Sequence, residues 1–405
     1  MSYLKFSADQ IFTGTELLSD QLVLITDQSG TIIDLVAEEN AGGDIQHHQG
    51  ILSPGFINTH CHLELSHMKG LIPENTGLAE FILKIVNERH HSEDLILQAI
   101  ADAEQSMINN GIVAVGDISN NALTLTQKQL GNLAYHNFIE VSGWKPAIAL
   151  PRYENALQVY ANFKDALNSG QRTTSNSNSR NISINPHAPY SVSNELWELM
   201  QPHFEGSVVT IHNQETPAEN QLFKDGTGNF IGMYQAMNID QTHFIPTGKT
   251  SLQSVLPKMQ NASNIVLVHN TESNPQDILM ANQQAIQNKQ TIYWCLCPNA
   301  NLYIENKMPN IDLLRRYNAN ITIGTDSLAS NHQLSILDEL KTITAFFPEI
   351  QLEELLQWAT LNGAKALLQD HQFGSFENGK RPGVILISKL NGEAINDTST
   401  INRLI

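Results

Sequence analysis

Cysteine, charge and long apolar runs are all scarce in this sequence, and each shortage excludes a class of protein. Three cysteines among 405 residues cannot form a disulfide framework, so we expect a reducing, cytoplasmic environment. No run reaches the roughly 18 apolar residues that a membrane span needs. The N-terminus also lacks a charged segment followed by an apolar one, so no secretory signal is predicted.

Basic residues are the scarcer of the charged types. The chain has 23 Lys and Arg against 41 Asp and Glu, a formal net charge of −18. A surface of this sign repels nucleic-acid phosphates and anionic lipids. We therefore expect neither a nucleic-acid polymer nor a membrane as partner, but a small molecule.

The order of apolar runs predicts an α/β protein. Residues 1 to about 50 alternate short apolar runs with turn signals, such as that over 27–30, and indicate a β-meander. Beyond Pro54 short apolar strands alternate with helical patterns, and no glycine-rich dinucleotide motif is present. The expected strands cover 51–60, 113–117, 137–143, 182–186, 208–212, 265–269, 291–296 and 320–326. The expected helices include 77–91, 93–110, 334–346 and 351–368.

Eight strands with helical connections predict a TIM-type (β/α)8 barrel over residues 54–369. The β pattern returns near 382–388, so residues 1–53 plus 370–405 are predicted to form one small, discontinuous β-sandwich domain. The low-complexity stretch 169–180 is predicted to be a surface loop away from the site. Cys295 and Cys297 lack the usual metal-binding spacing, and we assign them to a buried strand.

Polar residues gather at the predicted carboxyl ends of the strands, where the chemistry of such barrels is located. His60 and His62, spaced i and i+2 in a strand, point to the same side and could hold one divalent metal. Any one of these histidines alone could be a hydrogen-bonded structural residue, but several at one barrel mouth favour a site. The residues are His60, His62, His187, His212, His269 and Asp326.

The order of these motifs resembles the amidohydrolase superfamily. The matching pieces are Pro54-Gly-Phe-Ile-Asn-Thr-His60-Cys-His62, His212-Asn-Gln-Glu215, His269 and Gly324-Thr-Asp326-Ser-Leu-Ala-Ser-Asn331. The motif His187-Ala-Pro-Tyr-Ser191 resembles the branch of single-metal deaminases and chlorohydrolases, which includes guanine, S-adenosylhomocysteine and aminofutalosine deaminases. The terminal β-sandwich is also usual in this family.

The resemblance implies a role for each of these residues. His60, His62, His212 and Asp326 would bind one divalent metal, Zn²⁺ or alternatively Fe²⁺, a role that suits an N3O donor set. A water on the metal would be ionised near pH 7, and Asp326 would also hydrogen-bond to it. Glu215 would shuttle a proton to the ring nitrogen of the substrate. The alternative for Glu215 is an acidic residue in the exposed first turn of a helix.

His269 would orient the nucleophile or polarise the reacting carbon, and His187 would contact substrate. Glu64 resembles a carboxylate of aminofutalosine deaminases that faces the pocket, but it could equally support a metal-bound imidazole. Arg152, placed in the loop after the third strand, could pair with a substrate carboxylate, or it could be a surface residue beside a helix. The fourth strand has no lysine to bridge two metals, so a single metal is favoured.

The resemblance implies a metal-dependent aminohydrolase. Such an enzyme would convert an exocyclic amino group of a purine-type ring, on an adenosine derivative, to oxo with release of ammonia. One alternative is a hydrolase of the same fold acting on a cyclic amide, an imidazolone or a carbon–halogen bond. Another is a binding protein without activity, but such relatives typically lose ligands, and here all four are kept. The resemblance also implies a homodimer, since relatives are commonly dimers.

Overall fold

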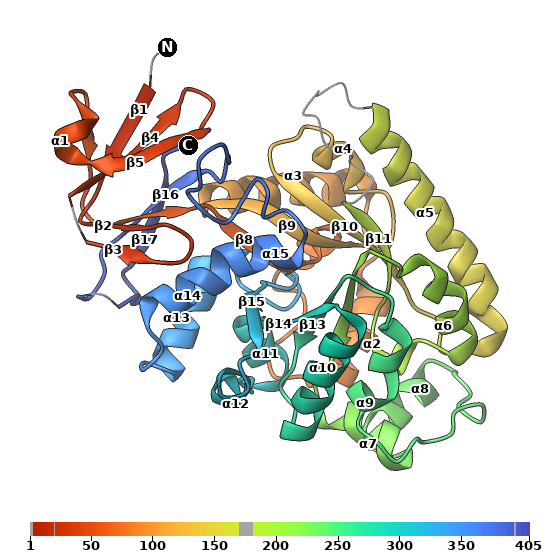
Figure 1. The fold of residues 1–405 in the computed structure, drawn as a ribbon. Coiled ribbons are helices and arrows are strands. Elements are labelled where there is room, and N and C mark those ends of the chain that lie inside the picture. Colours follow the sequence, from red (N-terminus) through yellow and green to blue (C-terminus); the bar gives the residue numbers. More distant parts are fainter. Residues whose placement is uncertain (1–2, 20, 170–180, 393) are drawn as a thin grey trace.

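Eight parallel strands form two four-stranded sheets at the centre of the molecule (Figure 1). The computed structural model describes residues 3–19, 21–169, 181–392 and 394–405. The first sheet has β8 (Phe56–Cys61), β9 (Ile112–Ser119), β10 (Ala134–Val141) and β11 (Ile182–Pro186), and the second has β12 (Val208–Asn213), β13 (Asn264–His269), β14 (Thr291–Leu296) and β15 (Asn320–Ile323). These strands follow chain order in each sheet, and the predicted parallel α/β architecture is confirmed.

Hydrogen bonds connect the outer strands of one sheet to those of the other. After β15 the chain forms a parallel bridge between Cys61 and Asp326. On the opposite side, the backbone N–H of His212 donates to the carbonyl of His187 at 2.9 Å, and that of Thr210 donates to Asn185 Oδ1 at 2.9 Å. The carboxyl ends of all eight strands therefore face one region.

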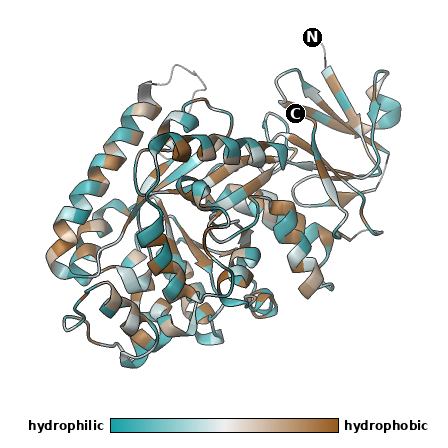
Figure 2. Cartoon of the chain, turned by 180° about the vertical axis from the view of Figure 1, so that it is seen from behind, coloured by the Kyte–Doolittle hydropathy of each residue, from teal (hydrophilic) through white to brown (hydrophobic). Residues whose placement is uncertain are grey.

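Helices lie around these sheets, and brown, hydrophobic segments occur on both the strands and the helices in Figure 2. Before β12 they are η1 (Leu63–Met68), α2 (Leu78–Glu88), α3 (Glu93–Asn109), α4 (Leu125–Lys128), η2 (Pro146–Ile148), α5 (Ala149–Ser169), η4 (Pro189–Ser191), α6 (Asn194–Met200) and η5 (Gln201–His203). After it come α7 (Pro217–Asp225), α8 (Phe230–Ala236), α9 (Ser251–Val255), η6 (Leu256–Met259), α10 (Pro275–Asn288), α11 (Pro298–Glu305), α12 (Ile311–Arg316), α13 (Ile336–Phe346), α14 (Leu352–Gln357), η7 (Trp358–Asn362) and α15 (Gly363–Ala366). Among the described helices, none is both long and apolar enough to cross a membrane.

Strands from both ends of the chain lie together beside the parallel sheets (Figure 1). One sheet has the order β5 (Ile32–Ala37), β4 (Leu22–Asp27), β1 (Tyr3–Ser7) and β6 (Gln46–His47), with α1 (Glu38–Ala41) at its side; the other has the order β17 (Thr400–Arg403), β16 (Val384–Ser388), β7 (Ile51–Pro54), β2 (Gln10–Phe12) and β3 (Leu17–Leu18). Both sheets contribute to one apolar cluster, with Phe6 and Leu24 from the first and Leu52 and Leu386 from the second. The expected meander turn is present, since Gly30 has a φ of 83° and its N–H donates to the carbonyl of Asp27 at 3.1 Å.

The single strand predicted over 51–60 is wrong, because the chain forms two strands there. Residues Ile51–Pro54 pair antiparallel with β16, whereas Phe56–Cys61 pair parallel with β9. Gly55 separates them: its N–H donates to the carbonyl of Pro382 at 3.1 Å, and a Cβ there would lie 2.3 Å from Val113. The apolar run is continuous because both strands are buried, so hydrophobicity alone does not reveal the break.

Two further expectations need correction, and one lies outside the described residues. The helix expected over 351–368 is divided into α14, the π-helical turn η7 and α15. Arg152 lies on α5 and not in a loop, because apolar residues spaced for a helix, among them Ala156, Val159 and Phe163, are buried from the first turns of α5 onward. Of the loop predicted over 169–180, residues 170–180 are outside the described part of the chain.

Candidate active site

Four buried side chains converge where the strands of both sheets end. They are His60, His62, His212 and Asp326, whose nitrogen and oxygen atoms lie within 4.8 Å of one another. His62 Nε2 lies 3.1 Å from His60 Nε2 and 3.1 Å from His212 Nε2. Asp326 Oδ1 lies 3.4 Å from His62 Nε2 and 3.7 Å from His60 Nε2. The structure thus brings together the four residues predicted from the sequence as metal ligands.

The backbone of β8 fixes the first two imidazoles. The carbonyl of His60 accepts from the N–H groups of Thr325 at 3.0 Å and Asp326 at 3.1 Å. Close approach of the two segments requires Gly324, since a Cβ there would lie 2.9 Å from the His60 Cβ. Alternation along the strand then places His60 and His62 on the same side.

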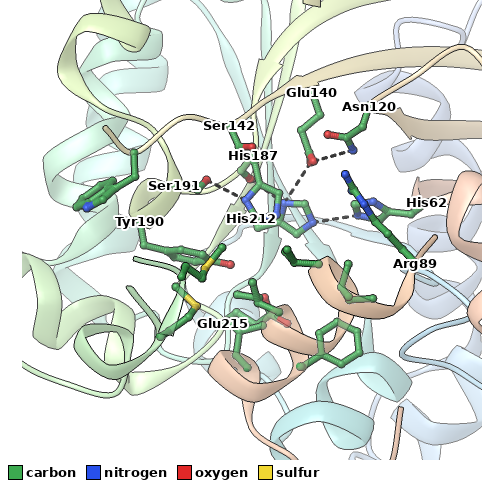
Figure 3. Close-up of a pocket in the computed structure, with 18 of the residues that line it drawn as sticks. His62, Arg89, Asn120, Glu140, Ser142, His187, Tyr190, Ser191, His212 and Glu215 are labelled. Carbon is green, nitrogen blue, oxygen red and sulfur yellow. Dashed lines mark hydrogen bonds and ion pairs between the residues drawn. The ribbon is translucent and has the colours of Figure 1, made fainter. Parts of the chain in front are cut away.

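A hydrogen bond decides which nitrogen of His212 faces the other ligands. His212 Nδ1 lies 2.7 Å from the carbonyl oxygen of His187, which can only accept. This contact assigns the proton to Nδ1 and leaves a lone pair on Nε2. His212 Nε2 faces His62 Nε2, and a dashed line in Figure 3 marks this contact of 3.1 Å.

Asp326 is held in a sparsely populated backbone conformation. Its φ is 56°, in the left-handed region that residues with a Cβ rarely adopt. Ser330 Oγ donates to Asp326 Oδ2 at 2.6 Å, which turns Oδ1 toward the histidines. Such local strain is typical of functional sites.

This donor set fits one divalent cation. Ligand atoms of a tetrahedral zinc site with bonds of about 2.0–2.1 Å lie roughly 3.3 Å apart, close to the separations seen here. Burial lowers the pKa of His62, and burial together with the neighbouring imidazoles lowers that of His212. Both rings are therefore neutral and can each offer a lone pair to a metal. Burial opposes ionisation of Asp326, but the neighbouring histidines hold its pKa well below the usual value. Imidazole nitrogens and a carboxylate oxygen are ligands that Zn²⁺ and Fe²⁺ accept.

Glu215 and His269 face each other beside these ligands. Glu215 Oε2 lies 3.6 Å from His269 Nε2, and both side chains are buried. The amide of Asn301 donates to His269 Nδ1 at 3.0 Å, which assigns the His269 proton to Nε2 on the side of the site. Burial lowers the pKa of His269 to about 3, so the ring is a neutral hydrogen-bond donor.

The loop after β12 sets the position of Glu215. Gln214 has a φ of 50°, and its N–H donates to Glu219 Oε1 at 2.8 Å. Burial, followed by the nearby carboxylates of Asp326 and Glu219, raises the pKa of Glu215 well above its usual value. A buried carboxyl group that keeps its proton is equipped to act as an acid.

His187 lies at the border of this cluster. Its Nδ1 is 2.9 Å from Ser191 Oγ, within the motif singled out in the sequence. Its ring packs against His212 with centroids 4.7 Å apart and is partly exposed to the cavity.

Three polar residues from neighbouring parts of the first parallel sheet form a second wall: Glu64 in η1, Asn120 directly after β9, and Glu140 on β10. Asn120 donates through its backbone N–H to Glu64 Oε2 at 3.0 Å, and through its side chain to Glu64 Oε1 at 3.0 Å and Glu140 Oε2 at 3.1 Å. Burial raises the pKa of Glu64 to about 7. Asn120 and Glu140 were not predicted as site residues, although a lone carboxylate within the apolar strand 137–143 was a usable signal.

One cavity of about 260 Å³ lies against this cluster (Figure 3). Its polar lining consists of His62, His212, Asp326, Glu215, His269, His187 and the three residues of the second wall, whereas His60 is fully buried and does not line it. Its other side is apolar and comes mainly from α2 and from the segment around α8. The apolar lining includes Phe81, Ile82, Ile85, Trp144, Met233 and Met237. The predicted residue Arg152 also lines the cavity, with an exposed side chain, as does Arg89 at the end of α2. The cavity therefore has a polar, ligand-rich end and an apolar end.

Comparison with known proteins gives consistent results for relatives and solved structures. The chain is 26% identical over 387 residues to a 5-methylthioadenosine/S-adenosylhomocysteine deaminase of Saccharophagus degradans, covering 89% of this chain and 77% of that protein. It is also 26% identical to an aminodeoxyfutalosine deaminase of Nitratiruptor sp., in a match that covers 88% of this chain and 85% of that protein. The crystal structure of Helicobacter pylori aminofutalosine deaminase with methylthio-coformycin superposes with a TM-score of 0.79 at 21% identity, covering 95% of this chain and 92% of that chain.

A zinc-containing structure of an adenosine deaminase from Xanthomonas campestris has the same fold, with a TM-score of 0.70 at 18% identity over 95% of this chain and 84% of that chain. The sequence profile of the Amidohydrolase family matches residues 51–403, which includes every residue of the site. As the order of its histidine and aspartate motifs predicted, the chain belongs to the Amidohydrolase family.

Proposed function

We propose that this protein is a single-metal aminohydrolase that deaminates an adenosine derivative substituted at its 5′ position. The observation that carries the proposal is the convergence of His60, His62, His212 and Asp326 in one buried cluster, three of which line the same cavity as Glu215. The reaction consumes one water and one ring amine, and yields the oxo ring and ammonia. The predicted class of reaction is confirmed by the family and by relatives that act on methylthioadenosine, S-adenosylhomocysteine and 5′-deoxyadenosine.

The four converging residues would hold one divalent metal, with Zn²⁺ as the first candidate and Fe²⁺ as the alternative. When bound, such an ion makes hydroxide available from water near neutral pH. Asn185 and Pro186 end β11, where a bridging lysine would be needed for a second metal of the carbamate type. This absence supports a single ion.

The protein groups would divide the proton transfers between them. Glu215 would give a proton to the ring nitrogen as hydroxide adds to the adjacent carbon, then help ammonia to leave. His269, with its proton on Nε2, would donate a hydrogen bond toward the same region. His187 would contact the substrate from the border of the cluster. A cyclic amidine needs this acid, because its leaving group is a poor one.

The architecture proposed around the site has two parts. The linked outer strands of the two parallel sheets support a closed (β/α)8 barrel over residues 54–369. The shared apolar cluster of the terminal sheets supports a discontinuous β-sandwich domain over 1–53 plus 370–405. A homodimer and a cytoplasmic location remain predictions.

A substrate panel tests the proposed function. Purified enzyme would be incubated with 5′-substituted adenosines, guanine, a pterin and an imidazolone, and ammonia release measured. We expect the 5′-substituted adenosines, with S-adenosylhomocysteine and aminofutalosine tried first, to have the highest kcat/KM. Turnover of guanine, a pterin or an imidazolone at least about a hundredfold faster would refute the nucleoside assignment, since a difference of that size reflects about 2.7 kcal/mol of transition-state binding.

A further inference from the structure

The wall formed by Glu64, Asn120 and Glu140 has an acceptor that nothing in the described part of the chain satisfies. Glu140 Oε2 accepts from Asn120, but Oε1 is buried and has no hydrogen-bond partner there. The residue is only 8% exposed and lines the cavity. A buried carboxylate oxygen without a donor is costly, so a ligand that donates at this place would be bound favourably.

The nearest imidazole does not supply the missing donor. His212 Nδ1 lies 3.8 Å from Glu140 Oε1, which is too long for a hydrogen bond, and its proton already goes to the carbonyl of His187. Figure 3 shows Glu140 between Asn120 and the His187–His212 pair, on the cavity side of the strands.

Glu64 and Glu140 are held as a pair. Asn120 bridges them through one amide nitrogen, at 3.0 and 3.1 Å, and its backbone N–H fixes the second oxygen of Glu64. Each carboxylate oxygen has two lone-pair sites, so both residues keep capacity for further donors. The wall consequently presents two adjacent acceptors, in fixed positions, in the cavity where the proposed function places the purine ring of the substrate.

A small neutral donor suits this wall, because the buried Glu140 Oε1 lacks a donor among the described residues. The cavity lining already includes two cationic side chains, Arg89 and Arg152. Hydroxyl groups need only an acceptor. Two neighbouring hydroxyls are found on the ribose of a nucleoside, next to its base.

We propose that Glu64 and Glu140, positioned by Asn120, bind the 2′ and 3′ hydroxyls of the substrate and make the enzyme selective for ribonucleosides. This assignment rests on the proposed function and names the part of the substrate that the second wall recognises. The apolar side formed by α2 and α8 is then left for the 5′ substituent. Neither Asn120 nor Glu140 belongs to the metal cluster or to the proton-transfer pair.

The test compares three substrates across three variants. The probes are 5′-deoxyadenosine, 2′,5′-dideoxyadenosine and 3′,5′-dideoxyadenosine, and the variants are Glu64→Gln, Glu140→Gln and Glu104→Gln. Glu104 is a matched control, because it is a buried carboxylate that binds Tyr135 and Gln127 outside the cavity. Metal content and thermal unfolding are measured for every variant.

For the wild type we expect kcat/KM to fall about ten- to hundredfold when either hydroxyl is absent, the range for a hydrogen bond to a charged acceptor. Glu64→Gln and Glu140→Gln should lower kcat/KM for 5′-deoxyadenosine by a similar factor, and change it less than about threefold for the probe that lacks the hydroxyl each residue binds. Glu104→Gln should lower kcat/KM by the same factor for all three probes, or leave all three unchanged.

Equal kcat/KM values for the three probes with the wild type would overturn the assignment, even if no variant folds. Equal losses on all three probes in the Glu64 and Glu140 variants would also overturn it, because they would indicate a structural role. If none of the probes is deaminated while a different heterocycle is, the proposed function itself fails, and this assignment fails with it.

Discussion

At the scale of single residues, the site depends on which atom of each side chain carries a proton. The contact with the carbonyl of His187 assigns the His212 proton to Nδ1, so Nε2 of this ring offers a lone pair. The contact with Asn301 assigns the His269 proton to Nε2, so this ring offers a hydrogen-bond donor. The protonated form of Glu215 is favoured by burial and by the nearby carboxylates of Asp326 and Glu219, which together raise its pKa. Lone pairs therefore meet on one side of the cavity and protons on the other.

Glu215→Gln separates metal binding from proton transfer. The amide keeps the size and hydrogen bonding of the side chain but cannot transfer a proton. We expect normal metal content and turnover lower by roughly 10²–10⁴-fold, measured by elemental analysis and ammonia release. Loss of metal in this variant would make Glu215 a ligand, and near-normal turnover would place the proton shuttle elsewhere.

Much of the residue-level site could be predicted from the sequence, and the exceptions have physical reasons. His60, His62, His212 and Asp326 lie at the carboxyl ends of strands or shortly after them, so a parallel fold brings them to one edge. A lone carboxylate in an apolar run marks Glu140 as unusual, but its contact with Asn120 depends on the pairing of β9 with β10, which the periodicity of one strand does not reveal. The position of Arg152 was wrong because the boundary between a loop and a helix depends on packing that composition does not reveal.

At the scale of elements, the close approach of β8 to the segment after β15 holds two ligands in place. The carbonyl of His60 receives two N–H groups from that segment, and Gly324 leaves no space for a side chain. The chain also breaks at Gly55, between β7 and β8. These two strands come from one apolar run but pair in different sheets, β7 with β16 and β8 with β9. Strand pairing over long distances decided both features.

Gly324→Ala should disturb the metal ligands without unfolding the protein. The new Cβ would lie 2.9 Å from the His60 Cβ and 2.9 Å from Cys295 Sγ, so β8 must shift. A displacement of about 1 Å can cost roughly a hundredfold in rate, and we expect at least a tenfold loss of activity with lower metal content. Gly232→Ala, in open space on α8, is the control and should change neither. Unchanged activity in the Gly324 variant would contradict the close-approach argument.

A buried ion pair supports the start of η1, which follows His62. Lys128 Nζ lies 2.5 Å from Asp117 Oδ2, and Asp117 Oδ1 accepts from the N–H of Leu63 at 2.8 Å. Lys128→Met would leave a buried carboxylate without its cation, which should lower the free energy of unfolding by about 3–5 kcal/mol in urea denaturation. Lys84→Met, which breaks an exposed pair with Glu80, should cost less than about 1 kcal/mol. Equal small effects would show that Asp117 is satisfied without Lys128.

At the scale of the whole molecule, the fold class was predictable because strands and helices alternate with clear periodicity. The relation between the terminal strands was also visible, since the β pattern returns after the last helices. Which strands pair in the terminal sheets could not be predicted from the sequence. For example, β16 pairs with β7, more than 300 residues earlier, and no local signal encodes that pairing.

The stability of the whole fold should depend on pH through His136. This buried ring contacts Ser183 Oγ at 3.1 Å, and burial lowers its pKa from 6.5 to about 3. Between these values the unfolded chain binds a proton that the folded chain does not, so the free energy of unfolding falls as the pH falls through this window. The slope is at most about 1.4 kcal/mol per pH unit.

His136→Phe removes this dependence while it keeps a ring beside Phe138. Urea denaturation at pH 7 and pH 5 should show a loss of stability smaller than in the wild type by about 2 kcal/mol. His90→Phe, at an exposed position, is the control and should lose stability as the wild type does. An unchanged difference between the two pH values in the His136 variant would mean that other groups cause the acid sensitivity.

The central claim is deamination of a 5′-substituted adenosine at one metal site, and a metal titration of the enzyme tests it most directly. Metal-free enzyme would receive increasing Zn²⁺, and ammonia release from S-adenosylhomocysteine would be measured alongside the change in absorbance from adenine to hypoxanthine. We predict no turnover without metal and a rise that ends at about one equivalent per chain, because the described residues contain one set of four converging ligands. Full turnover without metal, a rise that ends at two equivalents, or no deamination at any metal concentration would contradict the account.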